Sequence, residues 1–408
     1  MEAFFISPMA NIILFDDESR DHLLPLTYTR PVGELRVGIL TIKEKWEHYL
    51  EGSASYITQE YLGEKFPIFI EEDNYVINGG VLPNERLVKL IKQLDFNEAL
   101  LYKDELIATK LKVDQFDHLI EGGNIDELAG FDIKETPISK INKLWHIFQL
   151  NGQEIEADFR LLTKGKTSQK ISSSNQVINP EKIFIEEGAE VECAILSAKN
   201  GPIYIGKNAQ IMEGCMVRGG LALCDNAILK MGAKIYGPTT IGPHSKIGGE
   251  VNNSVIIGYS NKAHDGFIGN SILGEWCNLG ADTNTSNLKN DYAEVKLWNY
   301  PDQKFEKTNA QFCGLVMGDH SKCGINTMFN TGSVVGVSSN VFGDGYPRNF
   351  IPSFCWGGTH GFTTYRLDKA MEVAEVVMTR RSIKLSELDE SIMAEIFKSS
   401  SKFRSWEN

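Results

Sequence analysis

The chain lacks the features that would place it in a membrane or on a nucleic acid. It has no apolar run of 18 or more residues, so we expect no membrane-spanning helix and no membrane partner. Its N-terminus has neither a basic lead-in nor a small-residue cleavage site, so no secretory signal is expected. The formal charge of −13 argues against nucleic acid, which is bound by basic patches.

Cysteine is also missing from the first half, where no cysteine precedes Cys193. The total of 7 is odd and shows no metal-ligand spacing, which predicts buried free thiols, a reducing cytoplasmic location and no metal site. The apolar fraction of 42% and the charged fraction of 23% are typical of a globular protein. A length of 408 residues favours two or three structural units.

A six-residue repeat is what the chain has in abundance. A helix drifts off a period of six within two turns, whereas in a parallel β-helix each hexad forms one side of a coil with its aliphatic residue pointing inward. The repeat therefore predicts a parallel β-helix. The predicted inward positions are Ile205, Ile211, Val217, Leu223, Leu229, Ile235, Ile241 and Ile247, then Met317, Cys323, Phe329, Val335 and Val341.

The repeat divides the chain into three segments. Residues 1–165 show alternating strand and helix patterns, which predict an α/β domain with a mainly parallel sheet. A polar stretch then serves as a linker to the β-helix at 176–361. Residues 362–408 lose the hexads and show helical spacing, which predicts a C-terminal tail of two helices.

Two interruptions of the repeat, at 261–280 and 287–312, are the predicted ligand sites, because irregular segments on a regular scaffold usually carry function. Counting six residues from Ile257 predicts that Ala263 points inward and that its neighbour His264 points outward. On periodicity alone, a solvated surface histidine is the commoner explanation of His264.

The residues around His264 change that weighting. The runs Asn261-Lys-Ala-His264 and Asn278-Leu-Gly-Ala-Asp-Thr-Asn-Thr-Ser-Asn287 resemble the acetyltransferase half of the bifunctional N-acetylglucosamine-1-phosphate uridyltransferase/glucosamine-1-phosphate N-acetyltransferase (GlmU-like) family. That family carries Lys-Ala-x-His, Asn-Ile-Gly-Ala-Gly-Thr and Thr-x-Thr-x-Asn runs. The resemblance covers about half of the chain and implies a left-handed coil, a homotrimer and an active site between neighbouring coils. Two departures are Phe267, where the family has tyrosine, and a Lys-to-His spacing one residue shorter.

The resemblance assigns roles residue by residue. His264 would be the general base that deprotonates the amino group of the sugar, since an ammonium is not a nucleophile. Lys262 and Asn278 would contact sugar and phosphate, and Asn287 would help to place the amine. Ala281 would offer backbone contacts to the thioester of acetyl-CoA.

Lys289 and Arg348 are weaker candidates, for phosphate and coenzyme A contacts respectively. A lone lysine or arginine on a loop is more often simply solvated.

The N-terminal segment resembles the start of a sugar-phosphate nucleotidyltransferase, through Arg20, Pro25-Leu-Thr27 and Arg30-Pro31. The glycines that let backbone N–H groups wrap the phosphates are absent. Asp16–Glu18 would instead place three carboxylates against a triphosphate unless a cation such as Mg²⁺ bridges them. Two hypotheses stay open: a working enzyme in which Arg20, Arg30 and Arg36 hold the nucleotide, or a degenerate domain.

The sequence therefore predicts a trimeric enzyme that transfers an acetyl group from acetyl-CoA to an amino-sugar phosphate or a nucleotide-linked amino sugar, fused to a nucleotidyltransferase-like domain. One alternative is a sugar-1-phosphate nucleotidyltransferase whose β-helix is only a trimerising scaffold. The other is a non-catalytic protein that binds nucleotide sugars.

Overall fold

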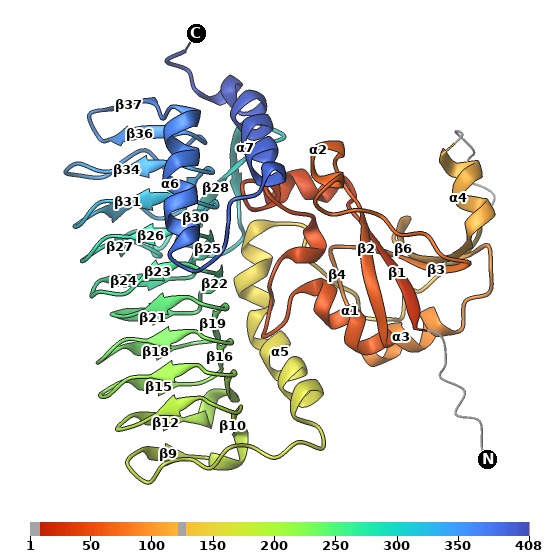
Figure 1. Ribbon diagram of the computed structural model, residues 1–408, viewed down its shortest axis with the longest axis horizontal. Coiled ribbons are helices and arrows are strands. Elements are labelled where there is room, and N and C mark those ends of the chain that lie inside the picture. Colours follow the sequence, from red (N-terminus) through yellow and green to blue (C-terminus); the bar gives the residue numbers. More distant parts are fainter. Residues whose placement is uncertain (1–8, 121–127, 408) are drawn as a thin grey trace. The chain divides into compact units, whose positions relative to one another are not determined.

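The structure, a computed structural model, describes residues 9–120 and 128–407 in two compact units (Figure 1). The first unit comprises the described parts of Met1–Arg20, Arg30–Leu35 and Leu40–Asn142, and the second comprises Asp21–Thr29, Arg36–Ile39 and Lys143–Asn408. The predicted domain boundaries stay a prediction. Among the described residues, no helix is both long and apolar enough to span a bilayer.

A six-stranded mixed sheet forms the centre of the first unit, in the order β2-β1-β3-β6-β5-β7. Strand β6 is antiparallel to both of its neighbours, and the other three pairings are parallel, so the sheet is mainly parallel as predicted. The strands are β1 (Ala10–Phe15), β2 (Gly52–Ile57), β3 (Asp73–Asn78), β5 (Glu98–Tyr102), β6 (Glu105–Lys112) and β7 (Ala129–Asp132). A separate two-stranded ladder joins β4 (Val81–Leu82) to β8 (Ser139–Lys140).

Local sequence signals fix where the helices of this unit begin. Helix α1 (Ile42–Leu50) starts after Thr41, which forms a capping box with Glu44. Helix α3 (Glu85–Lys92) starts after Asn84, whose side chain accepts a hydrogen bond from the backbone of Leu87. The unit also contains α2 (Glu60–Gly63) and α4 (Val113–Ile120). Short 3-10 helices in the chain are η1 (Glu18–Leu23), η2 (Leu26–Tyr28), η3 (Val32–Glu34), η5 (Pro180–Lys182), η6 (Ala198–Asn200) and η7 (Ser401–Phe403).

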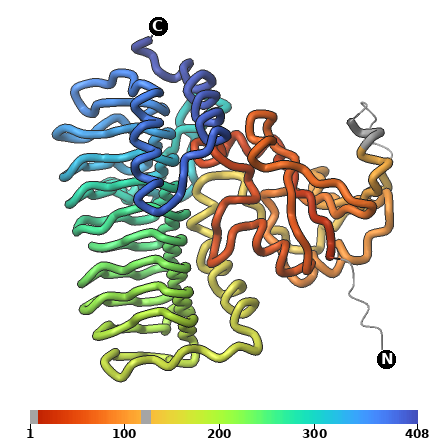
Figure 2. The backbone as a smooth tube through the Cα atoms, in the orientation of Figure 1, coloured from red at the N-terminus to blue at the C-terminus, as the bar shows by residue number. Residues whose placement is uncertain are grey.

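The second unit is a stack of coils whose strands form three sheets, visible as successive layers in Figure 2. The first sheet contains β10 (Ile183–Ile185), β13 (Ile203–Ile205), β16 (Leu221–Leu223), β19 (Thr239–Ile241), β22 (Val255–Gly258), β25 (Ile272–Glu275), β30 (Leu315–Met317), β33 (Ser333–Val335) and β35 (Phe350–Ile351). The second contains β11 (Glu190–Val191), β14 (Gln210–Ile211), β17 (Ile228–Leu229), β20 (Lys246–Ile247), β23 (Asn261–Lys262), β26 (Asn278–Leu279), β31 (Lys322–Cys323), β34 (Asn340–Val341), β36 (Cys355–Gly358) and β37 (Gly361–Thr364). The third contains β9 (Gln176–Ile178), β12 (Ile195–Ser197), β15 (Met216–Arg218), β18 (Lys234–Tyr236), β21 (Glu250–Asn252) and β24 (Phe267–Gly269).

The coil interior confirms the hexad repeat. Every inward position predicted from Ile205 to Ile247 and from Met317 to Val341 is buried and belongs to one continuous apolar cluster. Consecutive coils are held in register by parallel pairing, for example Leu223 with Ile241. The parallel β-helix is therefore confirmed, and its stability rests on neighbouring coils stacking their apolar faces.

The predicted register slips by one residue at the first interruption. Ile256 rather than Ile257 pairs with Ile241, and Lys262 rather than Ala263 pairs with Ile247. The count of six began at Ile257, whereas the inward residue is its neighbour Ile256, because the stretch from Ile241 to Ile256 is shorter than three hexads. The prediction that Ala263 points inward is wrong, whereas His264 is exposed as expected.

Further elements complete the second unit. Helix α5 (Leu144–Thr163) contacts β19, and the amide oxygen of its Asn151 accepts hydrogen bonds from the Gly38 backbone at 2.8 Å and from the Thr240 hydroxyl at 2.9 Å. The hairpin of β28 (Lys296–Asn299) and β29 (Lys304–Lys307) lies in the second interruption, and β27 (Asn284–Thr285) pairs with β32 (Met328–Phe329).

The C-terminal tail forms the two predicted helices, α6 (Leu367–Thr379) and α7 (Glu387–Ser399). Ala374 and Met378 of α6 pack against Trp276 of the coil. At the last coil, β37 runs antiparallel to β36, and Phe362 and Trp406 pack on the end of the coil's apolar cluster.

Candidate functional site

His264 lies on an exposed turn between β23 and β24 that is held from inside the coil. The side chain of Lys262 has no exposed surface, and its ammonium donates to the backbone carbonyl of His264 and, at 2.6 Å, to that of Asp265. Gly266 has φ +116°, and a Cβ there would lie 2.2 Å from the carbonyl oxygen of Thr283. The turn that presents the imidazole is thus fixed by an interior lysine and a required glycine.

Lys262 lies deeper in the coil than a residue on the ligand-facing surface would. It was expected to contact sugar and phosphate, but it occupies an inward position between Ile247 and Leu279 in a coil interior that is otherwise mostly aliphatic. Desolvation by burial lowers the pKa of Lys262 to about 8, although the nearby Asp265 and Asp282 favour its charged form. In the structure its ammonium holds the His264 turn from inside the coil, and its contact with sugar and phosphate stays a prediction.

The imidazole of His264 has no hydrogen-bond or ion-pair partner among the described residues. Catalytic histidines usually have one ring nitrogen oriented by a hydrogen bond. Nothing in the described part of this chain supplies that bond.

The two predicted asparagines lie on the same coil, Asn278 in β26 and Asn287 just after β27. Asn278 is exposed, pairs with Asn261 across the ladder, and accepts a hydrogen bond from the Asn261 amide at 2.9 Å. Asn287 is half-buried and donates to the side chain of Asn270 at 2.8 Å. Asn278 therefore presents a polar group at the surface, whereas the amide of Asn287 is already used in a hydrogen bond within the coil.

Ala281 and Phe267 are each held by the backbone. The carbonyl of Ala281 accepts from the Asn326 N–H at 2.8 Å, so that oxygen is already used. The N–H of Phe267 donates to the Asn284 side chain at 2.9 Å. The phenyl ring of Phe267 stays half-exposed in the position where the resembling family has a hydroxyl.

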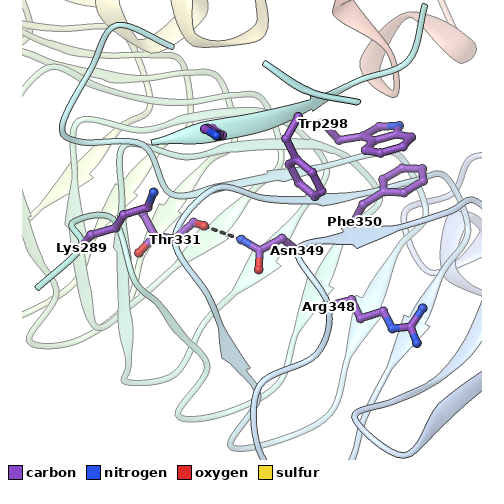
Figure 3. A pocket seen from close by; sticks show the side chains of 8 residues that line it. Lys289, Trp298, Thr331, Arg348, Asn349 and Phe350 are labelled. Carbon is purple, nitrogen blue, oxygen red and sulfur yellow. Dashed lines mark hydrogen bonds between the residues drawn. The ribbon is translucent and has the colours of Figure 1, made fainter. Parts of the chain in front are cut away.

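A pocket of about 610 Å³ lies on the second interruption and is lined by both Lys289 and Arg348 (Figure 3). The three catalytic-site predictions His264, Asn278 and Asn287 do not line it. Its walls are Lys289, Lys296, Trp298, Phe305, Thr331, Arg348, Asn349 and Phe350.

Aromatic rings build one side of this pocket. Trp298 stacks on Phe350 with ring centroids 4.2 Å apart and an interplanar angle of 12°, and Phe305 meets Trp298 edge-on at 5.4 Å. The two strands of the hairpin bring Trp298 opposite Phe305. Sequence reasoning chose Lys289 of this loop as a candidate and did not predict that Trp298 and Phe305 form one wall, for which alternation within the two strand segments was the available signal.

In the first unit, the three carboxylates of the run Asp16–Glu18 have different surroundings. Asp16 accepts hydrogen bonds from the Val32 N–H at 2.9 Å and from the Thr58 hydroxyl at 2.6 Å, and burial raises its pKa. Glu18 is exposed. The acidic run is therefore divided between three different environments.

Asp17 is neutralised by a lysine far away in the sequence. Its carboxylate accepts from Lys140 at 2.6 Å and from the Asn78 amide at 2.7 Å, at the carboxyl ends of β1 and β3. Burial by itself raises the pKa of Asp17, but the hydrogen bonds from Lys140, Ser19 and Asn78 outweigh burial and lower it. Lys140 also pairs with Glu105 at 2.8 Å.

These residues do not fit Mg²⁺. One oxygen of the Asp17 carboxylate, Oδ2, already accepts from the Lys140 ammonium, and Asn78 stands beside it as a neutral amide. No cluster of three acidic, histidine or cysteine side chains suited to a metal occurs within the described ranges.

The three arginines predicted to hold a nucleotide are buried, each less than a tenth exposed. Arg20 donates to the Tyr61 hydroxyl at 2.7 Å, and Arg36 donates to the backbone carbonyl of Ile39. Arg30 also has a partner within the chain. The three side chains are therefore largely enclosed by the protein, and their role toward a nucleotide stays a prediction.

Comparison with known proteins supports both halves of the predicted resemblance. Residues 12–167 match the family model described as sugar nucleotidyl transferase. The bifunctional protein GlmU of Methanocaldococcus jannaschii is 32% identical over 216 residues, which cover 50% of this chain and 45% of that protein. The GlmU of Methanococcus aeolicus is 30% identical over 209 residues, 51% of this chain and 46% of that protein. The chain spans less than half the length of these relatives.

A solved structure of AntD, an N-acyltransferase from Bacillus cereus in complex with dTDP-4-amino-4,6-dideoxyglucose and coenzyme A, is 13% identical and covers 50% of this chain and 91% of that one. Its TM-score is 0.23. The chain thus combines a domain that matches the sugar nucleotidyl transferase family with similarity to the bifunctional GlmU proteins over half of its length.

Proposed function

We propose that the protein is an acyltransferase that moves an acetyl group from acetyl-CoA to the amine of an amino-sugar phosphate or nucleotide-linked amino sugar. The observation that carries the proposal is the exposed imidazole of His264 on a turn fixed by Lys262 and Gly266. A solvated surface histidine needs no such support. The similarity to bifunctional GlmU proteins points to the same chemistry.

The reaction needs one proton transfer that His264 is suited to perform. The sugar amine attacks the thioester carbonyl, a C–N bond forms, and the C–S bond breaks. His264 accepts the proton that the amine loses and returns it to the departing thiolate of coenzyme A. Asn278, exposed on the neighbouring coil, would bind the acceptor sugar.

We also propose that the active form is a homotrimer. His264 has no orienting partner among the described residues of its own chain, which fits a site completed by a neighbouring copy. A reducing cytoplasmic setting is supported by the cysteines, all of which are free and all but Cys193 buried.

The test compares His264→Ala with His360→Ala, an equivalent change at another exposed histidine, which pairs with Asp344. Release of free thiol from acetyl-CoA is measured across a panel of amino-sugar phosphates and nucleotide-linked amino sugars. We expect His264→Ala to lower the rate roughly 10²–10⁴-fold, and His360→Ala to leave it unchanged. Light scattering should give three copies for both variants, with unchanged melting temperatures. Equal turnover by wild type and His264→Ala would refute the role of this histidine.

A second function is favoured by the family match over residues 12–167, namely recognition of a nucleotide or nucleotide sugar by the first unit. The pairing of Asp17 with Lys140 argues for binding without full nucleotidyl transfer, because it leaves no evident cation site. Calorimetric titration with UTP and dTTP, with and without Mg²⁺, should show weak binding that Mg²⁺ does not strengthen. Turnover of a sugar phosphate to a nucleotide sugar would overturn the reading of this unit as a binding domain.

A further inference from the structure

The pocket beside the β28–β29 hairpin concentrates positive charge in a chain whose net charge is −13. Lys289, Lys296 and Arg348 line it, and none of them forms an ion pair within the described residues. The ammonium of Lys289 instead donates to the backbone carbonyl of Glu294 at 3.0 Å. Three cations without carboxylate partners in one cavity indicate an anionic ligand.

The hairpin separates its charges by face. Side chains alternate along each strand, so Lys296, Trp298 and Phe305 share the face that lines the pocket. Glu306, opposite Leu297 on the other face, is occupied by Lys143 at 2.8 Å and by the Asn299 amide at 2.6 Å. The acidic group of the hairpin is thereby turned away from the pocket.

The aromatic side of the pocket adds a second requirement. Trp298 and Phe350 are stacked on each other, as Figure 3 shows, whereas Phe305 is 43% exposed and leaves ring surface for a planar group. A volume of about 610 Å³ is that of a site for a ligand of nucleotide size. Figure 3 also shows Lys289 and Arg348 on opposite sides of Asn349, so the positive charge is spread along the cavity.

We propose that this pocket binds a phosphorylated nucleoside, whose base stacks on Phe305 and whose phosphates are held by Lys289, Lys296 and Arg348. Two sources share that chemistry: the 3′-phosphorylated adenosine diphosphate end of an acyl-coenzyme A, and the nucleoside diphosphate of a nucleotide sugar. The binding itself does not depend on the acyl-transfer reaction. If the bound nucleoside belongs to the acyl-coenzyme A, the pocket serves the acyl donor of the proposed reaction. If it belongs to the nucleotide sugar, the pocket serves the acceptor.

The experiment is calorimetric titration of the full-length protein with adenosine 3′,5′-bisphosphate, UDP and dTDP as separate probes, and with adenosine and inorganic phosphate as half-ligand controls. Lys296→Gln and Arg348→Gln should each weaken binding of the preferred probe roughly 10-fold or more, because charge-assisted hydrogen bonds are lost. Phe305→Ala should weaken it by about 10-fold through lost stacking. The half-ligands should bind much more weakly than the whole probe.

Lys304→Gln is the matched control, because Lys304 carries the same charge on the opposite face of the same hairpin and pairs with Asp302 at 3.4 Å. We expect it to leave affinity unchanged. Preference for the adenosine bisphosphate assigns the pocket to the acyl donor, and preference for UDP or dTDP assigns it to the acceptor. The proposal is overturned if no probe binds, or if Lys296→Gln and Arg348→Gln weaken binding no more than Lys304→Gln, since a nucleotide bound elsewhere would not sense the pocket. Loss of acyl transfer in His264→Ala with nucleotide binding intact would show that the two proposals stand separately.

Discussion

The regular coils from Ile203 to Ile247 and the irregular coils from Glu250 to Thr285 differ in what they place inside. On the second sheet the regular coils stack Ile211, Leu229 and Ile247, all essentially without exposed surface. The next coil places Lys262 in the same column. An interior lysine is tolerated there because the irregular turn directs two backbone carbonyls at its ammonium.

This difference shows how one fold separates stability from function. Each buried aliphatic side chain of the regular coils contributes roughly 1.5–3 kcal/mol through burial. Burying Lys262 stabilises the fold less, because desolvating its ammonium costs free energy. The buried ammonium in turn fixes the surface turn that carries His264. The irregular coils therefore carry the polar groups. The hydrophobic stabilisation from the regular coils offsets the free-energy cost of burying them.

The largest expected effect comes from breaking a regular coil. Leu229→Ala should lower the free energy of unfolding by about 2–5 kcal/mol, because it leaves a cavity in a fully buried column. Its neighbour Ile228 points outward and is half-buried, so Ile228→Ala is the control and should cost less. Denaturant titration of both variants measures the difference, and equal losses would mean that the inward column does not dominate stability.

Replacing the interior lysine should give a smaller effect that depends on pH. The pKa of Lys262 is about 8 in the folded protein and 10.5 in the unfolded chain, so the unfolded chain binds more protons between these values. Below about pH 8 the buried lysine is charged, and its full desolvation cost lowers the free energy of unfolding. Between about pH 8 and 10.5 this cost diminishes, so the free energy of unfolding rises with pH. Lys262→Met removes this dependence.

We expect the stability of Lys262→Met relative to wild type to be highest near pH 7 and to fall by on the order of 1–3 kcal/mol toward pH 10.5. Thermal unfolding of the pair across that range measures it, and other titrating groups cancel because both proteins share them. A difference that does not change with pH would show that the lysine is not desolvated. The variant should also lose acyl transfer, since the His264 turn loses its interior anchor.

The smallest effect on stability is expected on the outer face of the irregular coils. Asn261→Ala removes the exposed hydrogen bond to Asn278 and should change the free energy of unfolding by no more than about 0.5 kcal/mol. If Asn278 binds the acceptor, the same change should raise the KM for the acceptor severalfold with little change in kcat. A stability loss near that of Leu229→Ala would place this pair among the structural contacts of the coil.

The sequence predicted the coil well because hexad spacing is a local property that survives in every regular turn. It failed at Ala263 because the coil after Ile241 is shorter than three hexads, so the inward column continues at Ile256 and Lys262 instead of Ile257 and Ala263. The pairing of Asp17 with Lys140 was out of reach for another reason. It depends on how distant strands meet, which no local pattern contains.

The last coil has a consequence for assembly in solution. A stack of parallel coils ends in an open edge whose backbone groups could recruit a further coil from another molecule, and such edges promote polymerisation. Here β37 folds back antiparallel on β36, and Phe362 and Trp406 cover the end of the interior. The chain thereby terminates its own repeat, so this end of the coil is blocked against end-to-end growth into fibres.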